Sequence, residues 1–203
     1  MKGKTQEALR DAAFEATFVV FGVVLALLAN EWREHQVSVR RAEHALSSIL
    51  EELEDNRASV SSSLEYHSGV IQAIDRAVMA SAAPNLRTFS RGFMSAANVY
   101  RTAWDSASAT GAFEDMSYAT VLRLSRVYAQ QDRYEHQVQG IAPIIYGELY
   151  RGGTSAILAN HRNLGTLIRS LAYRERELLE LYDATLATLG GRETGGPHGG
   201  GVP

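Results

Sequence analysis

An uninterrupted apolar run near the start of the chain constrains this protein more than any other feature. Residues 16–29 carry no charge, and their neighbours extend the mostly apolar stretch to residues 12–32. A helix of that length covers about 30 Å at 1.5 Å per residue, which matches the hydrocarbon core of a bilayer. Glu15 and Glu31 then lie near the two interfaces, and Trp32 lies where aromatic belt residues gather. The sequence therefore predicts a transmembrane helix over residues 12–32.

Two alternatives to this anchor stay open. A cleaved signal peptide fits the basic start at Lys2, Lys4 and Arg10, although no good A-x-A cleavage site follows the run. A buried helix of a soluble domain is the second alternative. Such helices usually carry a polar face, however, and this run is apolar all round.

Small residues on one face of the predicted span suggest that two such helices pack together. Gly22 and Ala26 form a small-xxx-small pair, and Asn30 follows four residues later. Close backbone approach and a shared hydrogen bond would favour a homo-oligomer, although this motif also occurs by chance.

From Val39 onward the chain carries a long helical pattern. Seam residues are spaced by threes and fours over about five to six heptads, with one four-four slip after Asn56. The members are Val39, Ala42, Leu46, Ile49, Leu53, Asn56, Val60, Leu64, His67, Ile71, Ile74 and Val78. No proline precedes Pro84, so we expect the membrane helix to run straight into a helix over residues 39–78.

The middle of the chain predicts two further helices. Residues 81–90 read as a connection, and a short helix is expected over residues 91–107, ending before Gly111. A longer helix is expected from an N-cap at Asp115, with a kink or break at Pro143.

A last helix is expected after Gly152-Gly153, capped by Thr154-Ser155 and stopped by Gly190-Gly191. Its seam again steps by fours and threes. The members are Ile157, His161, Leu164, Ile168, Leu171, Glu175, Leu178, Tyr182, Thr185 and Leu189. Polar residues such as Asn56 and Glu175 on the two seams would fix register or oligomeric state, in favour of a parallel homodimer.

Together these patterns predict an all-α protein. We expect an N-terminal tail over residues 1–11, the transmembrane helix over 12–32, and an antiparallel bundle of long helices over 33–189. The glycine-rich tail over residues 190–203 is expected to be disordered.

The opening of the chain resembles a family of small uncharacterised bacterial single-pass membrane proteins. The resemblance rests on Glu15-x6-Gly22-Val-Val-Leu-Ala26-Leu-x-x-Asn30-Glu-Trp32-Arg-Glu followed by a long charged helix. A second stretch is similar to the same family, so about 60% of the chain is covered in patches. It runs from Ala103-Trp104 through Thr110-Gly111, Tyr118, Leu124-Ser125, Tyr128 and Gln131 to Tyr134. The family usually has a second asparagine before the tryptophan, where Glu31 stands here.

The resemblance implies a location and no activity. It places the chain in a bacterial inner membrane as a single-pass protein. Basic residues flank the predicted span almost equally, and the amino-terminal ones favour a cytoplasmic N-terminus and a periplasmic bundle.

Composition excludes several kinds of chemistry. Cysteine is absent, so thiol catalysis, disulfides and Cys-ligated metals are excluded, and the only lysines are Lys2 and Lys4. Twenty basic and twenty-three acidic residues give a net charge of −3, which offers no footprint for nucleic acid. The six histidines form no HExxH or paired E-x-x-H motif, and the acidic run Glu51–Asp55 lacks a loop and reads as a solvated helix face. We expect neither cofactor nor metal.

One segment has the residue types of a binding surface. It combines aromatic and charged side chains around a glycine turn, which is typical of interfaces and equally of a packed corner between helices. Its members are Trp104, Asp105, Tyr118, Arg126, Tyr128 and Tyr134.

The sequence favours a membrane-anchored, non-catalytic helical interaction or scaffold module. Its partners would be the lipid bilayer and a second copy of the chain, with another membrane protein as a further candidate. The alternative is an extracytoplasmic sensory bundle that binds a small ligand between helices, near Trp104. An enzymatic function would need carboxylates or histidines from different helices to converge in a cleft. His67 and His161 fall on the predicted seams, where histidine is more often a satisfied core or register-setting residue than a ligand, and they could make a pH-sensitive contact if the two long helices pack together.

Overall fold

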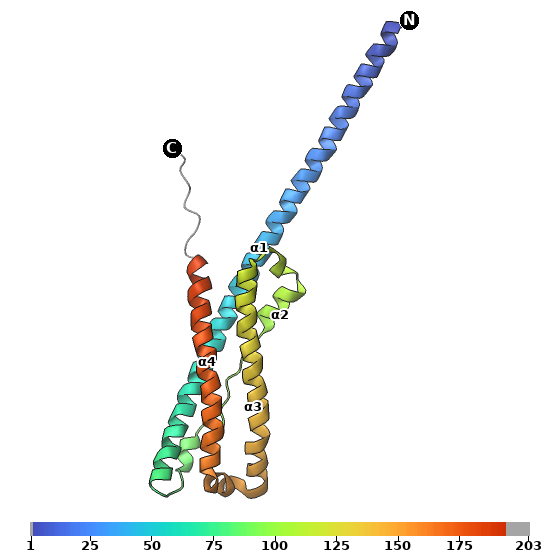
Figure 1. Cartoon of the computed structure of the whole chain (residues 1–203). Coiled ribbons are helices and arrows are strands. Elements are labelled where there is room, and N and C mark those ends of the chain that lie inside the picture. Colours follow the sequence, from blue (N-terminus) through green and yellow to red (C-terminus); the bar gives the residue numbers. More distant parts are fainter. Residues whose placement is uncertain (1, 194–203) are drawn as a thin grey trace, which may run out of the picture.

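The computed structural model describes the backbone of residues 2–193 and the side chains of residues 17–191 (Figure 1). Every regular element in this part is helical, so the predicted all-α class is confirmed. The elements are α1 (Lys2–Met79), the 3-10 turn η1 (Leu86–Phe89), α2 (Thr102–Ala109), the 3-10 turn η2 (Ala112–Asp115), α3 (Tyr118–Ala159) and α4 (His161–Glu193).

The first helix is continuous over 78 residues, as expected from the absence of early prolines. Its amino-terminal part projects beyond the bundle, and its carboxyl-terminal part packs within it (Figure 1). Ser81 turns the chain with φ 50°, and Pro84 then keeps the helix from resuming.

The three long helices do not all alternate in direction. In Figure 1, α1 and α3 run the same way and α4 runs antiparallel to both. Helix α4 packs closely against each of the other two. The predicted antiparallel bundle therefore holds for α1–α4 and α3–α4, and the parallel pair α1 and α3 requires a connection that returns the chain along the whole bundle.

That connection is where the sequence prediction fails. Residues 91–101, expected to be helical, form no helix, and only the end of the predicted helix, from Thr102 onward, is helical. A turn and a bend at residues 91–93 lead into a drawn-out segment that runs along the bundle (Figure 1). An extended chain advances about 3.3 Å per residue against 1.5 Å in a helix. An extended segment therefore spans the bundle with few residues. We call residues 91–101 the strap.

Helix boundaries in the second half of the chain differ from those expected. Ser117, and not Asp115, caps α3, because its Oγ accepts the N–H of Thr120 at 3.1 Å while Asp115 belongs to η2. Pro143 lies inside α3, and the residue with non-helical backbone angles is Gly153, at φ 64° and ψ −169°.

The last helix begins later and ends later than predicted. After the bend at Gly153, residues 154–159 form a final helical turn of α3, and α4 begins at His161. Gly190-Gly191 does not stop it, since α4 continues to Glu193. The rest of the predicted disordered tail, residues 194–203, lies outside the described residues.

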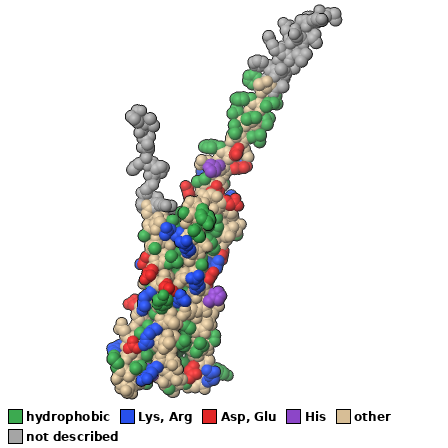
Figure 2. Space-filling model, viewed as in Figure 1, with side chains coloured by type: hydrophobic (Ala, Val, Ile, Leu, Met, Phe, Trp, Pro, Cys, Tyr) green, Lys and Arg blue, Asp and Glu red, His purple; other side chains and the backbone are tan. Residues whose placement is uncertain are grey.

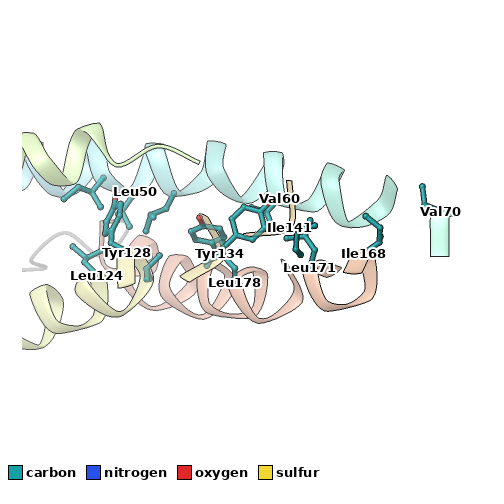
Figure 3. Close-up of a cluster of buried hydrophobic side chains, with 14 of the residues drawn as sticks. Leu50, Val60, Val70, Leu124, Tyr128, Tyr134, Ile141, Ile168, Leu171 and Leu178 are labelled. Atoms are coloured by element: carbon teal, nitrogen blue, oxygen red, sulfur yellow. The ribbon is translucent and has the colours of Figure 1, made fainter. Parts of the chain in front are cut away.

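The core confirms the seam of α4 and corrects the seam of α1. All predicted α4 positions from Leu164 to Leu189 are buried, whereas His161 is only half-buried. In α1 the heptad pattern runs without a slip, so Ser63 is buried where Leu64 was expected. The buried positions of α1 are Ala42, Ile49, Leu50, Leu53, Asn56, Val60, Ser63, His67, Val70, Ile74 and Ala77. Figure 3 shows Val60, Tyr134, Leu171 and Leu178 among the side chains of the buried interior.

The projecting part of α1 carries exposed apolar side chains on all its faces (Figure 2). Among the residues whose side chains are described, no helix has a stretch both apolar enough and long enough to cross a membrane. The described apolar run, residues 18–29, covers about 18 Å at 1.5 Å per residue. Residues 12–16, where the predicted span begins, lie outside the described side chains.

Packing between α1 and α4 predicts that leucine substitutions at two glycines will differ in their effect on stability. A Cβ atom at Gly165 would lie 3.1 Å from Cγ2 of Ile74, whereas one at Gly147 would have no neighbour within 4 Å. We expect Gly165→Leu to lower the free energy of unfolding by about 1–3 kcal/mol through overpacking. Gly147→Leu should leave it unchanged or raise it by up to about 1 kcal/mol, because leucine favours the helix. Urea denaturation of both variants measures this, and equal midpoints would contradict the packing.

Candidate functional site

The most densely hydrogen-bonded feature of the bundle is the strap. Extended backbone exposes an N–H and a C=O at nearly every residue, and buried groups of this kind need partners. No neighbouring strand is present among the described residues, so side chains of the helices supply these partners. Small residues at positions 95–97 let the strap backbone come close to them.

One end of the strap is held by Asn56 of α1. Its Nδ2 donates to the carbonyl oxygen of Tyr100 at 2.7 Å, and its Oδ1 accepts the Tyr100 N–H at 2.8 Å. Gln131 of α3 donates to the same carbonyl at 3.1 Å. The seam amide therefore satisfies the chain's own backbone, and the predicted role of Asn56 in setting an oligomeric state is replaced by this intramolecular one.

The other end of the strap is held by a buried cluster of four side chains. His67 and Ser63 of α1, Tyr134 of α3 and Glu175 of α4 are all at most 1% exposed. His67 Nδ1 lies 3.0 Å from both carboxyl oxygens of Glu175, and Ser63 Oγ lies 2.8 Å from Oε1. We call these residues the His67–Glu175 cluster.

Contact with the strap fixes the hydrogen positions in the His67 ring. The N–H of Ser95 points at His67 Nε2 at 3.2 Å, so Nε2 accepts and carries no hydrogen. A neutral imidazole with an accepting Nε2 has its hydrogen on Nδ1. His67 therefore donates from Nδ1 to Glu175, and the Ser63 hydroxyl is within reach of the Ser95 carbonyl.

Tyr134 joins the cluster to the next turn of the strap. Its hydroxyl oxygen accepts the N–H of Ala97 at 2.7 Å and lies 3.4 Å from Glu175 Oε1. Burial, and then the nearby Glu175, raises the pKa of Tyr134 well above its usual range. The tyrosine is therefore a neutral hydrogen-bonding residue throughout the ordinary pH range.

A third contact fixes the start of α2. Glu52 of α1 accepts the N–H of Ala103, in the first turn of α2, at 2.8 Å and the hydroxyl of Tyr128 at 2.7 Å. A carboxylate is favourable there because the first N–H groups of a helix have no partner within the helix. Burial and the Glu52 hydrogen bond raise the pKa of Tyr128.

The structure does not bring the six predicted binding-surface residues together. Trp104 packs against Tyr128 and Phe113, with ring centroids 4.8 and 4.6 Å apart, so it fills a packed corner. Tyr134 belongs to the His67–Glu175 cluster, and Asp105 pairs with Arg101 at 3.1 Å. Tyr118 and Arg126 lie on the surface.

The predicted membrane-helix contact face is exposed. No atom would meet a Cβ at Gly22 within 4 Å, and Ala26 is also exposed. Asn30 bonds within its own helix, donating to Glu34 at 2.7 Å and accepting from Arg33 at 3.1 Å. Its side chain is thus already engaged before any second helix approaches.

A shallow open groove of about 600 Å³ lies between α1 and the strap–α2 region. It includes Arg41, His44 and the acidic residues Glu51, Glu52 and Asp55. Across the side chains that the structure describes, no group of three or more His, Asp and Glu residues is arranged to hold a metal ion.

Ionisable residues from different helices do converge, but not in a cleft. His67 and Glu175 have side-chain exposures of 0% and 0%. A substrate has no access to them, so their chemistry is that of hydrogen bonding. Sequence reasoning placed both residues on seams; it missed Ser63 and the strap, although the unbroken 3–4 spacing through Ser63 was a usable signal.

Loss of the Asn56 contact predicts a measurable destabilisation. Asn56→Leu removes both hydrogen bonds to Tyr100 and leaves a backbone N–H without its partner. We expect the free energy of unfolding to fall by about 1–3 kcal/mol, because a stranded polar group keeps its desolvation cost. Asn98→Leu, on the exposed side of the strap, is the matched control and should change it by less than about 0.5 kcal/mol. Equal effects in chemical denaturation would contradict the assignment.

Comparison with known proteins adds no relative to this picture. No protein-family model, curated protein or solved structure matches the chain. The resemblance of its opening to bacterial single-pass membrane proteins stays a prediction.

Proposed function

We propose that this protein is a membrane-anchored, non-catalytic helical module that acts through contacts of its helix faces. The amino-terminal part of α1 would be the anchor, and the bundle formed by the rest of α1 with α2, α3 and α4 would be the interaction domain. We further propose a bacterial inner membrane location with the bundle in the periplasm, on the charge balance and the resemblance described above.

The observation that carries this proposal is the exposure of the apolar part of α1. Val19, Val20, Phe21 and Leu27 are each 60–65% exposed, and Val23, Val24, Leu25 and Leu28 are 45–55% exposed. An exposed apolar surface that encircles a helix is costly in water, at about 25 cal/mol per Å². Lipid acyl chains can cover every face of a helix at once, which a single protein groove cannot.

The length of the apolar part of α1 is compatible with a membrane-spanning anchor. The helix backbone continues without a break from the described apolar run back through residues 12–16, which are apolar except for Glu15. The whole stretch over 12–32 is about 30 Å long. The first buried bundle residue, Ala42, follows about ten residues later, so the bundle would stand about 15 Å beyond the interface on a rigid helix.

The anchor predicts membrane association that one charge can weaken. Full-length protein should remain in the membrane pellet after high-salt and carbonate washes. Val23→Arg should impair this, because arginine at the centre of a span costs about 2.5–3.5 kcal/mol. Val37→Arg, which changes an exposed valine outside the apolar run, is the control and should leave fractionation unchanged. Wild-type protein in the wash supernatant would contradict the anchor.

Self-association is proposed through the anchor alone. The α1 seam expected at the centre of a dimer is occupied by α4, with Ile49 at 0% exposure. Gly22 and Ala26 remain exposed and could meet a second copy or another membrane protein.

Disulfide cross-linking tests this self-association without interference, since the chain has no cysteine. Ala26→Cys in the membrane-bound protein should form a linked dimer under mild oxidation, and adding Gly22→Leu should reduce the yield by blocking backbone approach. Leu28→Cys, at an exposed position about 200° round the same helix from Ala26, is the matched control outside the contact face. Equal yields at both positions would indicate random collision.

A further inference from the structure

One contact of the strap is with a buried titratable side chain. Ser95 N–H is held by the unprotonated Nε2 of His67 at 3.2 Å. We propose that the amino-terminal half of the strap, residues 91–97, is a pH-sensitive latch: protonation of His67 at Nε2 removes this acceptor and releases the half-strap while α1 and α4 stay paired.

Protonation acts on the two sides of the ring in opposite ways. At Nε2 the new N–H faces the N–H of Ser95, so an attractive contact becomes a donor–donor contact. At Nδ1 the positive charge strengthens the contact with Glu175, whose oxygens lie 3.0 Å away. The α1–α4 contact therefore tightens as the strap contact is lost.

The ring has no free space in which to turn away. His67 is completely buried, and the neighbouring ring of Tyr66 lies 5.7 Å from it. The strap, in contrast, is a single extended segment beside the helices. The strap is therefore the partner that moves.

The groups facing His67 come from three helices. Glu175 of α4 is in direct contact, Tyr134 of α3 lies behind that carboxyl, and Tyr66 of α1 flanks the ring. On the strap side, Arg91 lies over the outer face of Tyr66, 5.1 Å from its centroid. Glu175 is therefore a second titratable group, in contact with His67. An experiment has to distinguish protonation of Glu175 from protonation of His67.

Residues 91–97 have other contacts besides the one with His67. Tyr134 accepts the Ala97 N–H at 2.7 Å, the Ser63 hydroxyl is within reach of the Ser95 carbonyl, Tyr66 donates to the Gly92 carbonyl, and Arg91 donates to the Ser62 carbonyl at 3.1 Å. Release therefore requires that the donor–donor contact at Ser95 breaks these contacts as well.

The other half of the strap has no contact with His67. Asn56 and Gln131 hold Tyr100, and Arg101 bonds to Asp132 at 2.8 Å. Release is thus confined to residues 91–97, which include Phe93 and Met94. Both side chains pack against the core, so release uncovers apolar surface on the bundle.

Amide hydrogen exchange on the full-length protein tests the latch. Protection factors of Ser95 and Ala97 should fall by at least about tenfold as the pH is lowered and His67 gains its second hydrogen, while those of Tyr100 and Ala103 stay constant. His67→Gln should keep Ser95 and Ala97 protected throughout, because glutamine offers a carbonyl acceptor and an amide donor but takes no proton. His136→Gln, at an exposed histidine, is the control and should behave as wild type.

A second variant separates the two titrating groups. Glu175→Gln keeps an acceptor for Nδ1 but removes the charge that attracts the imidazolium, so release should move to lower pH by about one unit. Disappearance of the pH dependence in Glu175→Gln would overturn the assignment to His67. Identical pH profiles for wild type and His67→Gln would overturn the latch itself.

Nitrogen NMR of the wild-type histidine rings gives an answer even where a variant fails to fold. His67 should carry hydrogen only on Nδ1 at high pH and gain a second one at Nε2 as Ser95 loses protection. A His67 ring that stays neutral while Ser95 loses protection would overturn the proposal.

Discussion

The requirement that buried backbone groups be hydrogen-bonded governs the interior of this protein. A helix meets that requirement within itself and a strand meets it in a sheet, but the strap is a lone extended segment among helices. Its N–H and C=O groups form hydrogen bonds with side chains that follow one another along the bundle, namely Asn56, His67, Ser63 and Tyr134. These four polar residues in an otherwise apolar core are therefore the partners of a backbone and not defects in a seam.

Topology follows from the same segment. Because the strap carries the chain back along the bundle, α3 runs parallel to α1 and α4 can pack antiparallel to both (Figure 1). Carboxyl groups from two helices secure the arrangement: Glu175 joins α4 to α1 at one level, and Glu52 joins α1 to α2 and α3 at another. The buried Glu175 and the half-buried Glu52 each have donors around them, which offsets the cost of taking a polar group out of water.

Two environments meet on one continuous helix. The projecting part of α1 exposes apolar residues on every face, whereas the bundle part buries one heptad stripe and exposes charges (Figure 2). Since no glycine or proline breaks the helix where these parts join, a displacement of one part is transmitted rigidly to the other. Release of residues 91–97 would then change the surface of the bundle at a fixed distance from the partner that binds the apolar segment.

The sequence by itself determined the helices and the α4 seam, because heptad spacing reflects only the geometry of one helix. It also singled out Asn56, His67 and Glu175 as polar residues on apolar stripes, and it indicated the apolar run before Trp32. It could not determine the strap, since Phe93, Tyr100 and Trp104 are spaced as on a helix. The strap backbone is instead held at Ser95 and Tyr100 by residues 28 and 44 positions away in sequence. The unbroken 3–4 spacing favoured Ser63 over Leu64, but it could not explain why a buried serine is favourable there, because Glu175 and the Ser95 carbonyl lie beside it only in the folded bundle. Those partners exist only in the folded bundle, and therefore the tertiary structure alone decided what the polar seam residues do.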